Sequence, residues 1–162
     1  MVTGDSSSGT SSSGPARLAV AAGVVAAVVL VDQLTKWWAV DRLALEPFHV
    51  VWRMDLALSR NTGSAFSLFQ GATGLIVVIA VALVAALLVM VWRAPTLGRA
   101  ATLGLILGGA LGNLSDRFFR SGGAVVDFVE FHFWPTFNVA DACVTVGCIL
   151  LAVSLLRGSA RR

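Results

Sequence analysis

The two residues best suited to catalysis are the aspartates Asp127 and Asp141. On one continuous helix, with a rise of 1.5 Å per residue, their spacing would separate them by about 21 Å. Pro135 lies between them and interrupts such a helix, so the chain can double back and bring the two carboxylates together. Neighbouring carboxylates do not both ionise easily, so one keeps a proton while the other acts as a base. Such a pair can activate a water for attack on an amide whose carbonyl is polarised by the protonated partner.

Four apolar segments provide the elements that must position these residues. Each is close to the roughly 20 residues that a helix needs to cross a bilayer. They cover residues 17–36, 72–92, 96–114 and 138–156. The chain is 57% hydrophobic and only 13% charged, which leaves too few polar side chains to cover the surface of a soluble enzyme. The sequence therefore predicts an α-helical polytopic membrane protein with four transmembrane helices.

Polar residues gather near particular ends of these segments. An up-and-down arrangement brings four segment ends to one membrane face. They are the end of the first segment, the start of the second, the end of the third and the start of the fourth. Ionisable residues at such depths are costly and usually functional. The residues expected to converge there are Asp32, Gln33, Lys36, Asn61, Asn113, Asp116, Arg117, Asp127, Asn138 and Asp141.

Parts of this polar set also have a purely structural interpretation. Asp32 and Lys36 are spaced i,i+4 and are equally consistent with a helix-end ion pair. The polar residues of 113–117 are consistent with the cap that ends the third helix. Asn138 fits an N-cap of the fourth helix, with Asp141 favoured in its first turn by the helix dipole. None of these interpretations explains the second carboxylate, at Asp127.

A glycine repeat on the third segment predicts close helix packing rather than a site. The neighbouring i,i+4 stripe joins a glycine to two of the polar residues, so one face can pack while the next presents polar groups. The packing face consists of Gly104, Gly108 and Gly112, and the stripe of Gly109, Asn113 and Arg117.

The segments outside the helices divide into tails and loops. Residues 1–16 are rich in Ser and Gly and are predicted to be a disordered tail, 17–157 form the membrane domain, and 158–162 form a basic C-terminal tail. Residues 48–58 partly alternate between apolar and polar, and a turn signal follows at 60–64, which predicts β structure. An alternative is that this loop only anchors the chain and binds no ligand.

The distribution of charges, cysteines and histidines excludes further classes of function. The net charge of +3 comes from scattered cations without a basic stripe, so nucleic-acid binding is not expected. Cys143 and Cys148 are expected to be packing residues, and neither His49 nor His132 lies in a metal-ligand or triad pattern.

An even number of spans places both termini on one side. Lysine and arginine are equally frequent on the two sides, and only their closeness to the span ends favours cytoplasmic termini.

Five motifs occur in order among the four apolar segments. They are VDQLTKWWA, RNTGSAFSLF, GGALGNLSDR, VVDFVEF and FNVADACVTVG. Each is weak alone, but the ordered set resembles the bacterial lipoprotein signal peptidase (signal peptidase II) family over roughly residues 17–157. One departure is the stretch FFRSGGA after Arg117, which is longer than the family pattern and leaves the path into Asp127 undefined.

The resemblance implies an aspartic endopeptidase of the bacterial cytoplasmic membrane. Such enzymes remove the signal peptide from diacylglyceryl-modified prolipoproteins and cut before the lipidated cysteine. The family pattern implies that the catalytic residues are Asp127 and Asp141, that Asn61, Asn113, Arg117 and Asn138 hold the substrate or steady the dyad, and that Asp32, Lys36 and Asp116 give structural support.

The resemblance also implies a location and a set of partners. The active site is expected at the outer membrane face with both termini in the cytoplasm, and the loop 48–69 is expected to form a β-rich cradle over the substrate. The expected partners are the prolipoprotein and membrane lipids, with no metal or organic cofactor, and the protein is expected to be a monomer.

Two other functions compete with this interpretation. A small proton-coupled transporter would also carry membrane carboxylates, but near the bilayer midplane and often with an internal repeat. Here the carboxylates lie at one interface, and no repeat is evident. A non-catalytic assembly factor could use the glycine face to bind partners, and it would be indifferent to the loss of Asp127.

Overall fold

The computed structural model describes residues 14–63 and 72–159. It contains four helices long and apolar enough to cross a membrane, so the predicted fold class is confirmed. They are α1 (Gly14–Arg42), α2 (Ala72–Trp92), α3 (Leu97–Phe119) and α4 (Val139–Ser159). The predictions for the tail residues 1–13 and 160–162 and for residues 64–69 of the first long loop lie outside the described residues.

Four predicted helix boundaries need correction. One is the end of helix α1, which was predicted at residue 36 and lies at Arg42. Helix α1 already includes residues 14–16, which the sequence assigned to the tail, and Pro15 is well tolerated in a first helical turn. Helix α4 continues to Ser159, into the predicted C-terminal tail. Helix α3 runs five residues past Leu114, where an i,i+4 ion pair between Asp116 and Arg120 supports its last turns.

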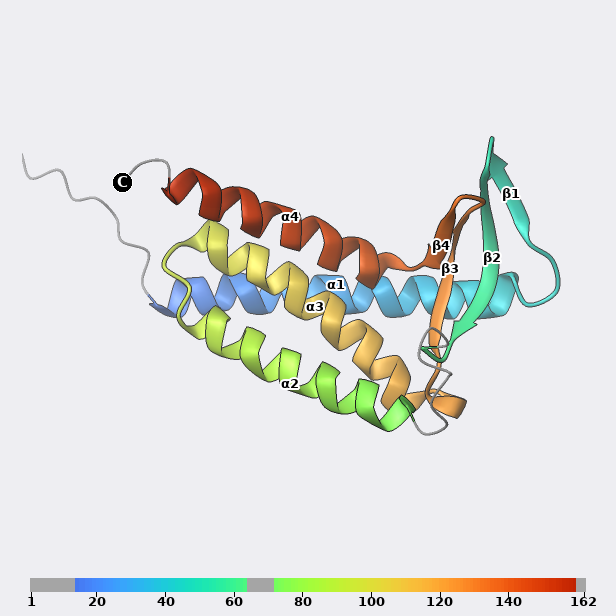
Figure 1. Ribbon diagram of the computed structural model, residues 1–162, viewed down its shortest axis with the longest axis horizontal. Helices are drawn as coiled ribbons and strands as arrows, with labels where there is room; N and C mark the ends of the chain where they lie inside the picture. The colour runs from blue at the N-terminus through green and yellow to red at the C-terminus, as the bar shows by residue number, and fades with distance from the viewer. Residues whose placement is uncertain (1–13, 64–71, 160–162) are drawn as a thin grey trace, which may run out of the picture.

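Helix α3 is the centre of the bundle and contacts each of the other three helices (Figure 1). The glycine face predicted on α3 packs against α1, because a Cβ on Gly108 would lie only 2.8 Å from the Cβ of Val28. Gly109 approaches α4 as closely, since its Cβ would lie 2.5 Å from the carbonyl oxygen of Ala140. The packing role predicted for Gly104, Gly108 and Gly112 is therefore confirmed, whereas the close packing of Gly109, predicted on the polar stripe, was not expected.

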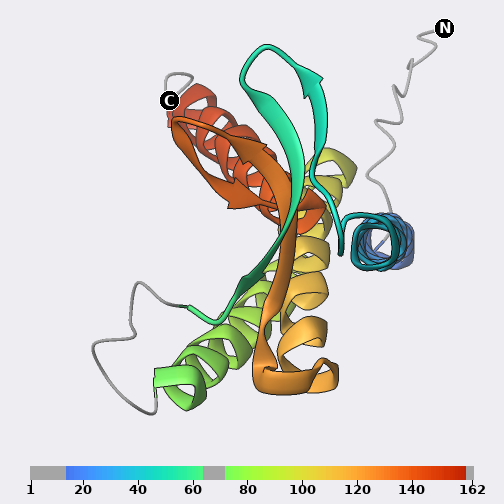
Figure 2. The ribbon, with the colours of Figure 1, turned by 90° about the vertical axis from the view of Figure 1, so that its right-hand side faces the viewer.

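A four-stranded antiparallel sheet crosses one end of the bundle (Figures 1 and 2). Its strands, in spatial as in chain order, are β1 (Phe48–Val51), β2 (Met54–Asn61), β3 (Val125–Phe131) and β4 (Trp134–Phe137). The β1–β2 hairpin falls where alternation predicted β structure. The opposite end of the bundle carries the α2–α3 turn and the C-terminal end of α4.

The β3–β4 hairpin is a feature that the sequence analysis missed. Strand β3 pairs with β2, with Arg60 opposite Val126, so its hydrogen-bonding partner comes from the other long loop. Pro135, interpreted as a helix breaker, lies on the edge strand β4, where a missing N–H is tolerated. The FFRSGGA stretch forms the short 3₁₀ turn η2 (Ser121–Gly123), in which Gly122 and Gly123 adopt positive φ angles of 77° and 64°. This turn defines the path from α3 into the strand that carries Asp127.

Candidate active site

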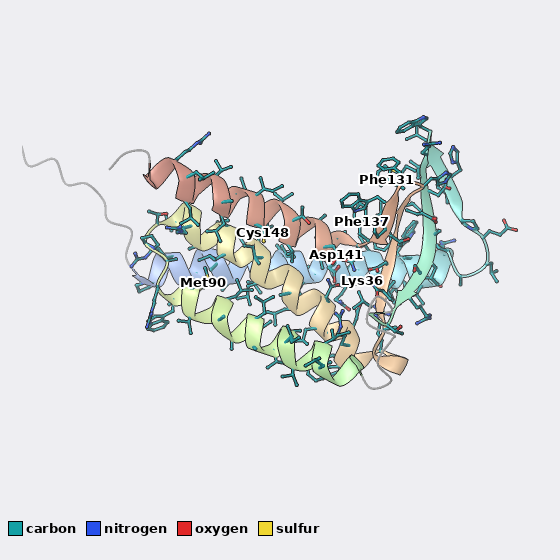
Figure 3. All side chains as sticks on the ribbon, viewed as in Figure 1. Lys36, Met90, Phe131, Phe137, Asp141 and Cys148 are labelled. Carbon is teal, nitrogen blue, oxygen red and sulfur yellow. The ribbon has the colours of Figure 1, made fainter. Side chains whose placement is uncertain are left out.

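Asp127 and Asp141 come from different kinds of element. Asp127 lies in β3 opposite Ser59 of β2, and its side chain is 2% exposed. Asp141 lies in the first turn of α4, at the end of the bundle nearest the sheet (Figure 3). Both carboxylates accept hydrogen bonds from Asn138, so the fold brings the two aspartates to one site.

Asn138 connects the two aspartates directly. Its Nδ2 atom donates to Oδ1 of Asp127 at 2.6 Å. Its Oδ1 accepts the backbone N–H of Asp141 at 3.0 Å, and Oδ2 of Asp141 accepts the backbone N–H of Asn138 at 3.2 Å. This reciprocal pair is a capping box at the start of α4. The N-cap predicted for Asn138 is therefore present, and the same side chain also binds the second carboxylate.

Asn113 forms a second link to the pair. Its Nδ2 donates to Oδ1 of Asp141 at 2.8 Å, and its Oδ1 accepts from Asn138 at 3.0 Å and from Nζ of Lys36 at 2.9 Å. Since α3 continues beyond this position, the interpretation of residues 113–117 as a helix cap is wrong. Asn113 instead fixes the orientation of Asp141 relative to a buried cation.

Lys36 lies fully buried between two carboxylates. Its Nζ is 2.9 Å from Oδ2 of Asp32 and 3.0 Å from Oδ2 of Asp116, and none of these three side chains is more than 1% exposed. The i,i+4 ion pair expected between Asp32 and Lys36 is therefore present, but it is part of a larger group. A buried charge must be paired and hydrogen-bonded, and here the ammonium has three acceptors, the third from Asn113.

Each carboxylate beside Lys36 also holds the backbone next to one of the two paired aspartates. Oδ1 of Asp32 accepts the N–H of Ala140 at 3.0 Å, one residue before Asp141. Oδ2 of Asp116 accepts the N–H of Val126 at 3.1 Å, one residue before Asp127. The structural support predicted for these residues therefore has a defined form, because one buried cation connects the backbone positions of both aspartates.

Two further residues support this group: Gln33, which was predicted in the converging polar set but given no role there, and Arg120, which was missed. Gln33 donates to Asp32 at 3.1 Å and to Asp116 at 3.2 Å, and Arg120 donates to Asp116 at 2.8 Å. The i,i+4 spacing of Asp116 and Arg120 was a usable signal in the sequence. The spacing of Gln33 gave no such signal, since its acceptors other than Asp32 lie in α3, about 80 residues later in the chain.

The environment of Asp127 favours its protonated form. Burial raises the pKa of this carboxyl group, and the negative charge of Asp141 raises it further. Hydrogen bonds from Asn61, whose Nδ2 lies 3.1 Å from Oδ2, and from Asn138 oppose this rise and lower the pKa. The net effect is a raised pKa, as expected for one member of a pair that shares a proton.

Two cavities meet at Asp141. One, of about 360 Å³, lies between α2, α3 and α4. Its walls are mostly apolar, and its polar end is formed by Asn113, Arg117 and Asp141. The other, of about 370 Å³, lies between β4 and α4 and is lined by Trp134, Phe137 and Asp141 among others. Arg117 also donates to the carbonyl oxygen of Asn113 at 3.1 Å, so all nine predicted site residues belong to one region.

The fold and this site together define a class, an integral membrane peptidase of the aspartic type. The family model for signal peptidase (SPase) II matches residues 24–157. The lipoprotein signal peptidase of Rhodococcus jostii (strain RHA1) is 46% identical over 83% of this chain and 72% of its own length. That of Mycobacterium avium (strain 104) is 41% identical over 89% of this chain and 82% of its own length. The chain belongs to the signal peptidase II family.

A solved structure agrees with this assignment. It is a bacterial membrane enzyme determined by the in meso method, with a TM-score of 0.78 and 28% sequence identity over 84% of this chain and 92% of the solved chain. The resemblance drawn from the five motifs is thus confirmed, as is the prediction of a peptidase. The transporter alternative is not supported.

Proposed function

We propose that this protein hydrolyses the peptide bond before the lipidated cysteine of diacylglyceryl-modified prolipoproteins, with Asp127 and Asp141 as its catalytic dyad. Two features of the site support this function. Asn138 binds both aspartates, and Asp141 lies where two cavities meet. A substrate that passes Asp141 can therefore extend into a cavity on either side while its scissile amide faces the pair.

The raised pKa of Asp127 supports a division of roles between the two carboxylates. Asp127 keeps its proton and donates it to the carbonyl oxygen of the scissile bond. Asp141 accepts a proton from water, whose oxygen attacks the carbonyl carbon. The tetrahedral intermediate then collapses and the C–N bond breaks. The proton held by Asp141 passes to the leaving amine, and a hydroxyl group of the intermediate returns a proton to Asp127 as the carbonyl forms again.

Polar side chains at the end of the first cavity are suited to hold the substrate main chain. Asn113 and Arg117 line this cavity together with Asp141, whereas its other walls come from apolar side chains such as Leu75 and Ile79. An apolar signal-peptide segment fits such walls because its burial needs no polar partner. Asn61, through its bond to Asp127, steadies the dyad from the sheet side.

We also propose that the sheet lies at the outer face of the cytoplasmic membrane, with both termini in the cytoplasm, and that the protein acts as a monomer surrounded by lipid. The N-terminal end of α1 and the C-terminal end of α4 lie at the same end of the bundle, opposite the sheet (Figure 1), which fits an even number of spans. Large apolar side chains are exposed along the helices, as at Leu75, Val78 and Leu156, and suit contact with lipid tails. An alkaline phosphatase fusion at the C-terminus should be inactive, and an active fusion would overturn this orientation.

Cleavage of a defined substrate tests the proposed activity. The purified protein is incubated with a diacylglyceryl-modified prolipoprotein and, in parallel, with the same precursor lacking the lipid. Mass spectrometry should find a product whose N-terminus is the lipidated cysteine, and only from the modified precursor. Cleavage at another bond, or equal cleavage of both precursors, would contradict the proposed specificity.

A further inference from the structure

A second cluster of titratable side chains lies on the sheet, away from the dyad. Asp55 of β2 binds two imidazoles, with its Oδ1 2.6 Å from Nδ1 of His49 and its Oδ2 2.8 Å from Nε2 of His132. His49 is the direct partner of Asp55 across β1 and β2, and His132 follows the end of β3. One carboxylate therefore ties three neighbouring parts of the sheet together. We call Asp55, His49 and His132 the clasp.

The clasp holds the turn between β3 and β4 against β2. The backbone N–H of His132 also donates to the carbonyl oxygen of Arg53 at 3.3 Å. Next to it, the ring of Phe133 lies 6.3 Å from that of Trp52, the residue at the β1–β2 turn with a positive φ of 51°. A residue with such a φ needs support from its surroundings. The side-chain contacts and the backbone bond thus join the two hairpin turns.

The same turn leads directly into a wall of the second cavity. Trp134, two residues after His132, and Phe137 both line this cavity beside Asp141. Phe137 stacks on Phe131 of β3 at a ring distance of 6.1 Å, and both side chains are labelled in Figure 3. The position of this aromatic wall consequently depends on how firmly the β3–β4 turn is held.

The groups that surround the clasp determine how it responds to protons. Glu130 of β3 is the direct cross-strand partner of Asp55, and Arg53 lies in the β1–β2 turn with its guanidinium 6.0 Å from the ring centre of Trp52. Hydrogen bonds from His132 and His49 lower the pKa of Asp55, so this carboxylate stays ionised where imidazoles titrate. An imidazole ordinarily changes charge near pH 6.5, and a charged donor binds a carboxylate more strongly than a neutral one.

We propose that Asp55 is a positioning residue for the aromatic wall of the second cavity, and that proton uptake by His49 and His132 tightens its hold on the β3–β4 turn. The wall is then most firmly placed at mildly acidic pH and loosens as the imidazoles lose their charge. Its consequence for substrate binding rests on the proposed function, because only a substrate in the second cavity would be affected. His49 and His132 are 64% and 50% exposed, so water competes with the clasp, and the effect is expected to be modest.

Kinetics separate this role from that of the dyad. The KM for a diacylglyceryl-modified precursor and kcat are measured from pH 5.5 to 8.5 for the wild type, Asp55→Asn and the double variant His49→Gln/His132→Gln. The wild-type KM should rise by up to about fivefold with pH, the range expected of exposed charged pairs. Both variants should show a high KM that no longer depends on pH, while kcat keeps its pH profile. Asp41→Asn, which removes an exposed carboxylate paired with Arg42 in α1, is the matched control and should behave as the wild type.

A second readout does not depend on activity. In protein labelled with 5-fluorotryptophan, the ¹⁹F resonance of Trp134 is assigned by its absence in Trp134→Phe. This resonance should shift with pH in the wild type and stay fixed in Asp55→Asn or, if that variant does not fold, in the double histidine variant. A Trp134 resonance that ignores pH in the wild type, or that shifts equally in the variants, would overturn the proposal. If the protein cleaves no precursor but the resonance follows the clasp, the proposed function fails and the positioning role stands.

Discussion

The Nδ2 atom of Asn138 lies 2.6 Å from Oδ1 of Asp127, and both side chains are almost fully buried. This hydrogen bond joins the start of α4 to strand β3, two elements that are separated along the chain by strand β4. The Oδ1 atom of Asn138 also caps α4, so the oxygen and the nitrogen of this side-chain amide have different roles. A substitution can therefore remove one contact and keep the other.

Asn138→Asp should separate capping from catalysis. Aspartate caps a helix as well as asparagine does, so the start of α4 should be preserved. The variant loses the hydrogen-bond donor to Asp127 and adds a negative charge beside it. A neighbouring like charge disfavours the ionised form of a carboxyl group. We expect kcat to fall by about tenfold or more, in the range of lost electrostatic contacts at active sites. Asn138→Ala should in addition lose about 1 kcal/mol of stability. Wild-type kcat in Asn138→Asp would contradict the role given to this bond.

The pH profile should respond to Asn61. Its hydrogen bond lowers the pKa of Asp127, so Asn61→Ala should raise that pKa further. Activity needs the proton on Asp127 and falls as pH rises through this pKa, so the alkaline limb of kcat/KM should move to higher pH. Thr62→Ala, at the exposed neighbouring position, is the control and should leave the limb in place. A limb that moves to lower pH in Asn61→Ala would contradict the assignment.

The raised pKa of Asp127 also has a consequence for stability. A carboxyl group whose pKa is higher in the folded than in the unfolded protein binds protons more tightly when folded. Its contribution to stability is therefore greatest at low pH and is lost as pH rises from the ordinary aspartate value to the raised value. Asp127→Asn should remove this dependence, so thermal unfolding should favour the variant increasingly at higher pH. A wild type that instead gains on the variant as pH rises would refute the direction of the shift.

Removal of Lys36 should be severe. Lys36→Met keeps the length of the side chain but leaves Asp32 buried without its cation, while Asp116 keeps only Arg120. Breaking a buried pair in this way typically costs about 3–5 kcal/mol. We expect a large drop in thermal stability and loss of activity. Arg42→Met removes one partner of the exposed Asp41–Arg42 pair and should change stability by less than about 1 kcal/mol. Equal effects of the two substitutions would show that the buried group is not stabilising.

A methyl group at Gly112 should disturb the same network sterically. The Cβ of an alanine there would lie 2.6 Å from Oδ2 of Asp32, the atom that binds Lys36. We expect Gly112→Ala to reduce kcat by about tenfold, since small displacements of supporting groups are costly in active sites. Gly98→Ala, on the same helix with no atom within 4 Å of its Cβ, should retain wild-type activity. Normal cleavage by Gly112→Ala would indicate that Asp32 can move without effect.

Local patterns predicted the helices and much of the site. The apolar segments were long enough to identify α2 directly, and the spacing of the glycines on α3 predicted its packing face. The convergence of polar residues followed from up-and-down connectivity alone. These inferences succeeded because each depends on residues close in the chain or on a simple topology.

Other features depended on contacts between distant segments. Strand β3 forms because VVDFVEF finds the free edge of β2, about 65 residues earlier, and no local signal specified that pairing. Gln33 reaches Asp116 across a similar interval, so its role was not visible from spacing. The helix cap inferred at residues 113–117 failed for the same reason, since those side chains find partners in α1 and α4 and the helix continues past them.

Asp127 and Asp141 are proposed to act together as the catalytic pair. The most direct test measures cleavage of a diacylglyceryl-modified precursor by purified wild type, Asp127→Asn and Asp141→Asn, with folding verified by thermal unfolding. Each variant keeps the shape of the side chain and loses the ionisable group. This pairing predicts that either substitution lowers kcat by at least about a thousandfold while the protein stays folded. Activity close to that of the wild type in either folded variant would contradict it.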